Sequence, residues 1–106
     1  MLTGIILAAS LAVSQWYIFD AHDHSCITTE AAAAAFGIPD MHTPGDYNAM
    51  VEDDSDYGGM HIISNKDGTT LMVFVTKGKH TVVFFPDLED CNLYKTLYLN
   101  KLEPKT

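Results

Sequence analysis

Alternating polar residues near the start of the chain form its most unusual chemical pattern. Asp20, His22, His24 and Cys26 stand at every second position. In an extended segment, alternate side chains point to the same side, so all four would face one way. Imidazole, carboxylate and thiolate groups are ligands for copper, nickel and zinc. One interpretation is therefore a metal site that uses His22 and His24. The other, which we favour, is a polar stretch ahead of the domain.

Cys26 and Cys91 are the two cysteines of the chain. There is no CxxC pair and no set of four cysteines, so a closed zinc site of cysteines is excluded. An even pair in a small domain is typical of one disulfide in an oxidising compartment. Closing so long a loop would stabilise the fold by roughly 4 kcal/mol in the chain-entropy model. Two unpaired buried thiols in a cytosolic protein are the alternative.

A run of acids, Glu52 to Asp56, precedes two glycines and resembles a calcium-binding loop in composition. Clustered carboxylates are the ligands that calcium prefers. The EF-hand register fails, however, because Tyr57 stands at its sixth position and Ile63 at its twelfth. We therefore expect a solvated acidic turn here.

Nucleophilic catalysis would need a cysteine or Ser25 beside one of the five histidines. The sequence contains no GxSxG, no glycine-rich phosphate loop and no HExxH. Neighbours such as His24 and Ser25 are not thereby a dyad, because catalytic geometry is spatial. A domain this small also leaves little room for a cleft of several hundred Å³. We expect no enzyme, and we expect structural roles for His61 and His80 at strand ends.

The first nineteen residues carry no charged side chain, and Gly4 to Val13 has the composition of a secretory h-region. Small residues precede a cleavage point after Ser14, whereas cleavage after Ala21 would place Phe19 at the disfavoured −3 position. We predict a cleaved signal peptide. An uncleaved anchor of nearly the ~20 residues that cross a bilayer and a helix buried in the domain are the alternatives.

The remaining length suffices for one small domain. We assign residues 1–21 to the signal peptide or N-terminal anchor with a short polar linker, and residues 22–106 to the domain. Six lysines, no arginine and fourteen acids give the chain a net charge of −8. Such a charge excludes nucleic acid and anionic membrane surfaces as partners, because both require clustered cations. Residues 1–65 hold nine of the acids and no lysine. They form a solvated acidic face or, alternatively, a surface for a basic partner or a divalent cation.

An alanine-rich helix is predicted where Thr28, Thr29 and Glu30 precede five alanines and Phe36. Hydroxyl residues cap helix starts, and Gly37 is a typical stop. Residues 37–59 are rich in glycine, proline and acids, which favours an irregular segment with a short strand near residues 47–51. Residues 90–102 fit a helix or a strand, and we favour the helix.

Three apolar runs between Met60 and Pro86 are separated by turns at residues 65–68 and 77–79. Valine, isoleucine, threonine and phenylalanine favour strands, and the turn glycines favour tight hairpins. We therefore predict an antiparallel meander of three strands, or four if the C-terminal segment is a strand. With the alanine-rich helix packed on it, the fold class is α+β.

Both faces of this sheet are apolar, so both need a cover. The alanine-rich helix can cover one face. The N-terminal segment, the C-terminal segment or another chain must cover the second. We expect a partner to bind one of three surfaces: one face of the sheet, the opposite face, or the free edge at residues 60–64. The residues on the first of these faces are Met72, Phe74, Val83 and Phe85.

A leader, a cysteine before a small-residue helix, and a meander with Asp-Gly-type turns together resemble the plan of small exported bacterial α+β proteins of unknown function. The resemblance covers about residues 24 to 90 and implies a fold and an exported location, but no activity. Cys91 departs from that plan, in which the second cysteine lies near or within the third strand.

We expect a periplasmic or secreted, non-enzymatic domain without a cofactor, held by a Cys26–Cys91 disulfide, that binds another protein or itself. It would meet a membrane only if residues 1–19 are retained as an anchor. A small periplasmic protein that binds copper, nickel or zinc through His22 and His24 is the alternative.

Overall fold

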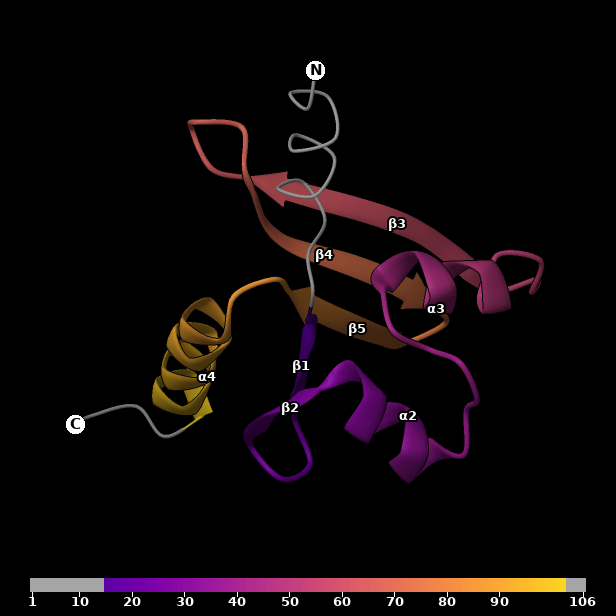
Figure 1. The fold of residues 1–106 in the computed structure, drawn as a ribbon, viewed down its shortest axis with the longest axis horizontal. Coiled ribbons are helices and arrows are strands. Elements are labelled where there is room, and N and C mark those ends of the chain that lie inside the picture. The colour runs from indigo at the N-terminus through magenta and orange to yellow at the C-terminus, as the bar shows by residue number, and fades with distance from the viewer. Residues whose placement is uncertain (1–14, 103–106) are drawn as a thin grey trace, which may run out of the picture.

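A computed structural model describes residues 15–102 of the chain. These residues form a sheet of five antiparallel strands with two short helices on one face and one longer helix on the other (Figure 1). The predicted α+β class is confirmed. The elements in chain order are β1 (Tyr17–Asp20), β2 (Ser25–Thr28), α2 (Thr29–Phe36), α3 (Pro44–Val51), β3 (Tyr57–Ser64), β4 (Thr70–Lys77), β5 (His80–Phe85) and α4 (Leu88–Leu102).

The predicted meander is present as β3, β4 and β5, which occupy neighbouring positions in the sheet order β2-β1-β5-β4-β3. Gly68 and Gly78 have φ angles of 91° and 60° in the two connecting turns. Only glycine adopts such angles at little cost, which explains why the turn composition located both hairpins.

The sheet has two strands more than the predicted meander, because β1 and β2 form an additional hairpin. Tyr17 lies opposite Phe85, and Ile18 lies opposite Phe84, so β1 is an inner strand. An inner strand is apolar on both faces, which gives it the same composition as the end of a secretory h-region. The predicted boundary after residue 21 therefore falls in the β1–β2 turn, and residues 17–20 lie in the sheet. The predicted h-region itself lies outside the described residues.

Helix α2 begins and ends where the sequence predicts. The Thr28 side chain accepts a hydrogen bond from the Ala31 backbone N–H, and Gly37 ends the helix in the left-handed conformation. Ala32 and Ala33 are buried against the sheet. Their short side chains let the helix axis approach β1 and β2 closely.

Helix α3 occupies the middle of the segment predicted to be irregular and replaces the short strand expected near residues 47–51, while residues 37–43 and 52–56 are irregular as predicted. Thr43 accepts a hydrogen bond from the Asp46 backbone N–H, and the Asp46 carboxylate accepts one from the Thr43 backbone N–H. This reciprocal capping box, with Pro44 in the first turn, starts the helix. Of the glycines and prolines that indicated a loop, Pro44 and Gly45 belong to the first turn of this helix.

Helix α4 confirms the helical prediction for the C-terminal segment. It covers the second face of the sheet over β1, β2 and β5. Tyr94 packs against Phe19 and Phe85 with ring centroids 5.6 and 5.4 Å apart, and Tyr98 packs against Phe19 at 5.0 Å. From the sequence, we expected one of three covers for this face. Among the described residues, the C-terminal segment is the one that covers it.

Candidate functional site

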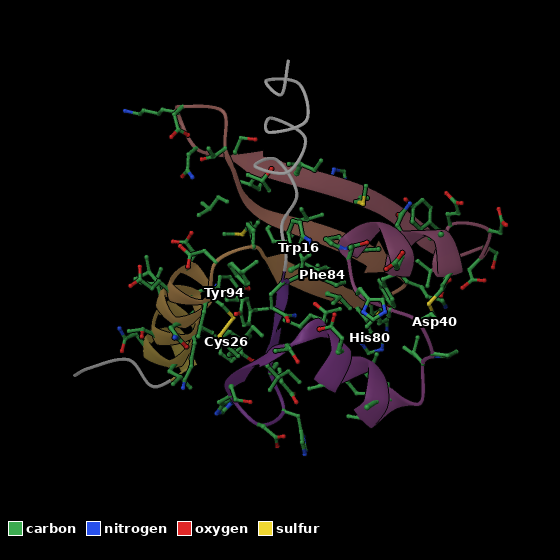
Figure 2. All side chains as sticks on the ribbon, viewed as in Figure 1. Trp16, Cys26, Asp40, His80, Phe84 and Tyr94 are labelled. Carbon is green, nitrogen blue, oxygen red and sulfur yellow. A yellow bond between two sulfur atoms is a disulfide. The ribbon has the colours of Figure 1, made fainter. Side chains whose placement is uncertain are left out.

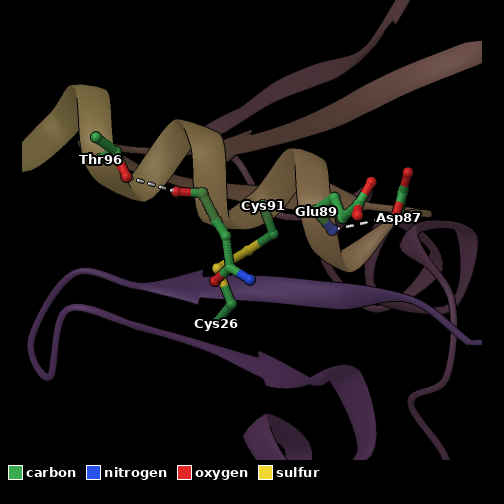
Figure 3. Close-up of a disulfide and its surroundings, with 6 residues drawn as sticks. Cys26, Asp87, Glu89, Cys91 and Thr96 are labelled. Atoms are coloured by element: carbon green, nitrogen blue, oxygen red, sulfur yellow. Dashed lines mark hydrogen bonds between the residues drawn. A yellow bond between two sulfur atoms is a disulfide. The ribbon is translucent and has the colours of Figure 1, made fainter.

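The disulfide joins Cys26 in β2 to Cys91 in α4, with their Cα atoms 6.1 Å apart (Figure 3). This pairing is the one expected from the sequence. Cys91 is fully buried in the core between α4 and the sheet. The bond therefore fastens α4 to the outermost strand on that side of the sheet.

The two histidines of the candidate metal site lie in the β1–β2 turn and are exposed. The His24 ring lies against Tyr98 of α4, with centroids 5.9 Å apart. His22 instead lines a cavity on the opposite face of the sheet, together with His80. Cys26 is held in the disulfide. Within residues 15–102, no three His, Cys, Asp or Glu side chains converge on a point that could hold a metal ion.

The acidic run after α3 is attached to the β4–β5 hairpin by hydrogen bonds and ion pairs. Lys77 Nζ lies 3.0 Å from Asp56 and 3.6 Å from Asp54, and the Gly78 N–H donates to the Asp56 carbonyl at 2.7 Å. The hydrogen bond from Lys77 lowers the pKa of Asp56, and the same bond raises the pKa of Lys77. These contacts give two of the acids a structural role in holding the turn.

A second charged pair, which sequence reasoning missed, joins α2 to the segment before α3. His42 Nδ1 lies 2.8 Å from a carboxylate oxygen of Glu30. Hydrogen bonds from the Gln15 side chain and from His42 lower the pKa of Glu30, while the bond to Glu30 raises the pKa of His42. Twelve residues separate the partners, so no local spacing could have indicated the pair.

A cavity of about 520 Å³ lies where α2 and α3 face the inner strands. It is larger than we expected, since a domain this small leaves little room for a cleft of several hundred Å³. Its walls are mainly apolar, with Asp20, His22, Lys79 and His80 among the polar lining residues. Figure 2 shows His80 in the space between α2 and α3. Asp20 is already engaged, because its carboxylate accepts hydrogen bonds from the backbone of the β1–β2 turn. Among residues 15–102, no serine or cysteine lines this cavity.

The four residues expected at a partner surface share one face of the sheet, but α4 covers two of them. Phe85 is 0% and Val83 is 8% exposed, so neither side chain is available to a partner. Met72 and Phe74 on β4 stay partly exposed. The alternation of the strands placed all four on one face, but it could not indicate how far a distant helix would extend over that face.

Three of the exposed large apolar residues lie on β3, next to partly exposed residues of β4. Met60 is 38%, Ile62 57% and Ile63 41% exposed. Ile63 lies opposite Met72 in the β3–β4 register. We call residues 60–63 together with Met72 and Phe74 the open sheet end. It includes most of the free edge predicted from the sequence.

Helix α4 adds an apolar ridge that sequence reasoning missed. Leu93 and Leu97 stand four residues apart, and both are exposed. Residues at this spacing lie one above the other on a helix. Leu97 shares a surface hollow with Tyr94, the residue that packs on Phe85 of β5. The ridge therefore lies on the side of α4 that faces β5.

Comparisons with protein-family models, with curated proteins and with solved structures find no match for this chain. Within residues 15–102, no helix has the length and apolarity needed to span a bilayer. Fold and surfaces together define a small disulfide-bonded α+β domain with an apolar sheet end that the described helices leave partly exposed.

Proposed function

We propose that this protein is an exported, non-enzymatic domain that acts by binding another protein or a second copy of itself through the open sheet end. The observation that carries the proposal is the exposure of Met60, Ile62 and Ile63 together on one edge strand. Burying such a side chain fully stabilises a complex by about 1.5–3 kcal/mol before the costs of association. Ile63 shares one sheet face with Met72 and Phe74, whereas Met60 and Ile62 point to the opposite face, so the edge is apolar on both faces. Exposed apolar groups that lie together mark interaction surfaces in soluble proteins.

Export is supported by the disulfide and by the position of β1. A disulfide in a small domain is typical of oxidising compartments. Of the two cleavage points considered, the one after Ala21 would remove β1 and separate β2 from β5. Cleavage after Ser14 leaves every described residue in place. We therefore favour a mature protein that begins at Gln15.

Mass spectrometry of the protein recovered from an exporting host tests location and crosslinking together. The expected species begins at Gln15 and lacks the two hydrogens that a disulfide removes. A retained N-terminus on the recovered protein, or a mass that includes both thiols, would contradict the export part of the proposal.

Site-specific photo-crosslinking tests the association. A photoreactive residue in place of Ile63 or Met72 samples the open sheet end, and the same residue in place of Asp23 samples the exposed β1–β2 turn as a matched control. We expect covalent adducts from positions 63 and 72 and none from position 23. A folded, disulfide-bonded protein that forms no adduct from either of the first two positions does not associate through this surface.

A further inference from the structure

The rim of the sheet at β3 has none of the usual protection against pairing in its central part. β3 is the last strand in the sheet order, and Figure 1 shows it at the rim of the sheet. It carries no proline, lysine, arginine, aspartate or glutamate between Tyr57 and Ser64. Edge strands that stay unpaired usually carry such residues, because their free backbone groups otherwise bind another strand.

The free backbone groups of this edge can be assigned from the register. Lys77 and His80 close the two-residue β4–β5 hairpin and form a hydrogen-bonded pair. Because hydrogen-bonded and non-hydrogen-bonded pairs alternate along antiparallel strands, β4 bonds to His61 and Ile63. The N–H and C=O groups of Met60 and Ile62 are therefore directed to the open edge.

The regular part of β3 is short and sets where a second strand can pair. Its register with β4 shifts between Tyr57 and Gly59 and again between Ile63 and Ser64. Residues 59–63 are thus the regular stretch, and His61 is its midpoint. A two-fold axis at His61 places Met60 opposite Ile62 of a second strand. Both residues have outward-directed backbone groups, as a hydrogen-bonded pair requires.

The charges beyond the two ends of β3 fit the same register. Acids Glu52 to Asp56 precede the strand, and Lys66 follows it in the exposed β3–β4 turn. Antiparallel pairing about His61 brings Lys66 of one copy to the end of the strand where the acidic run of the other copy lies. Lys77 compensates only part of the acidic run, through Asp54 and Asp56. The acidic end therefore retains charge that complements a partner's lysine.

We propose that β3 pairs with β3 of a second copy, antiparallel and with the two-fold axis at His61, so that two five-stranded sheets join into one. This inference rests on the proposed function and names its partner as a second copy of the chain. The dimer is isologous, because each copy offers the same edge and the same pair of charged ends.

Cysteine substitution tests the register. In the proposed dimer the two residues at position 61 form a non-hydrogen-bonded pair with Cα atoms about 4.5 Å apart, within the range that a disulfide spans. We expect His61→Cys to form a covalent dimer under mild oxidation. Ile62→Cys, which is also exposed, is the matched control and stays unlinked because it faces position 60 of the partner. Equal crosslinking of both variants would overturn the register.

Analytical ultracentrifugation of the exported protein tests the pairing itself. We expect a monomer–dimer equilibrium that Ile62→Lys weakens at least tenfold, because it places a charge on the paired edge. Lys66→Glu should weaken it about tenfold through its two symmetric ion pairs. Lys101→Glu, the same charge change on α4, should leave it within about twofold. A protein that stays monomeric at every soluble concentration would overturn the proposal. Equal effects of Lys66→Glu and Lys101→Glu on the dimer would also overturn it.

The crosslinking outcomes separate this inference from the proposed function. Adducts from positions 63 and 72 of twice the chain mass agree with the second copy as partner. Adducts of any other mass, together with a monomeric purified protein, would reject the second copy while the association function stands. The absence of all adducts would reject both.

Discussion

Cys91 is buried in the packing between α4 and the sheet, and its bond to Cys26 closes a loop of 65 residues. A disulfide lowers the conformational entropy of the unfolded chain, and this stabilises the folded state relative to the unfolded one. A domain of this size has only about 5–15 kcal/mol of total stability. Single residues therefore decide whether α4 keeps its place on the sheet.

Replacing both cysteines by serine should lower the free energy of unfolding by about 4 kcal/mol. Urea titration followed by circular dichroism measures the change, with reduced wild-type protein as the control for side-chain effects. An unfolding midpoint equal to that of the oxidised wild type would show that the bond contributes nothing.

The Glu30–His42 pair should stabilise the fold only over a limited pH range. Glu30 has a pKa below its ordinary 4.5, so its contribution is present above 4.5 and is lost as the pH falls through the lower folded value. His42 has a pKa above its ordinary 6.5, so its contribution is complete below 6.5 and is lost as the pH rises through the higher folded value.

We expect His42→Gln to lower Tm slightly near about pH 5.5 and to have a smaller effect above the folded pKa of His42. Thermal unfolding across this range measures the difference between variant and wild type. Because both side chains are exposed, the effect is small. A difference that grows steadily with rising pH has the wrong sign for this pair.

At the scale of elements, helix α3 depends on the cap formed by Thr43 and Asp46. Thr43→Ala removes the hydroxyl that accepts from the Asp46 N–H and should cost about 0.5–2 kcal/mol of stability. Ser55→Ala removes a hydroxyl from the exposed turn after α3 and should change little. Chemical unfolding of both variants provides the comparison, and equal effects would show that the cap does not stabilise α3.

The elements that sequence reasoning identified are those whose signals are local. The alanine-rich helix has its cap at Thr28 and its stop at Gly37, and the β3–β4 and β4–β5 hairpins have their turn glycines. Helix α3 also has a local signal, in Thr43 and Asp46, but the glycine and proline between them favoured a loop. A threonine three residues before an aspartate is typical of a capped helix start, but we interpreted this stretch as a loop.

The β1 strand illustrates a different limit. An inner strand buried on both faces has no polar alternation, so its composition equals that of an apolar leader. Its pairing with β5 joins residues that are more than sixty positions apart, which no local pattern indicates. The candidate site was likewise predicted only in part, because some of it depends on contacts between distant residues. The free edge of β3 follows from the meander, but the cover of Phe85 depends on where α4 packs.

At the scale of the whole molecule, the fold distinguishes the two cleavage points. A mature chain that begins at Gln15 retains all five described strands and should unfold cooperatively. A chain engineered to begin at His22 lacks β1, so β2 loses the strand that joins it to β5, and α4 loses its packing on Phe19. We expect that chain to lack a cooperative thermal transition. If its Tm equals that of the longer chain, β1 is not integral to the fold.

The order of synthesis gives the position of β1 a further consequence. The first strand to leave a ribosome or a translocation channel pairs with the last, since Ile18 must wait for Phe84. Contacts between such distant positions form late and slowly. The local hairpins can form early, but the β1–β2 hairpin cannot join the meander until β5 is available. In the exported protein that we propose, the sheet closes only when nearly the whole chain has reached the compartment where the cysteines oxidise.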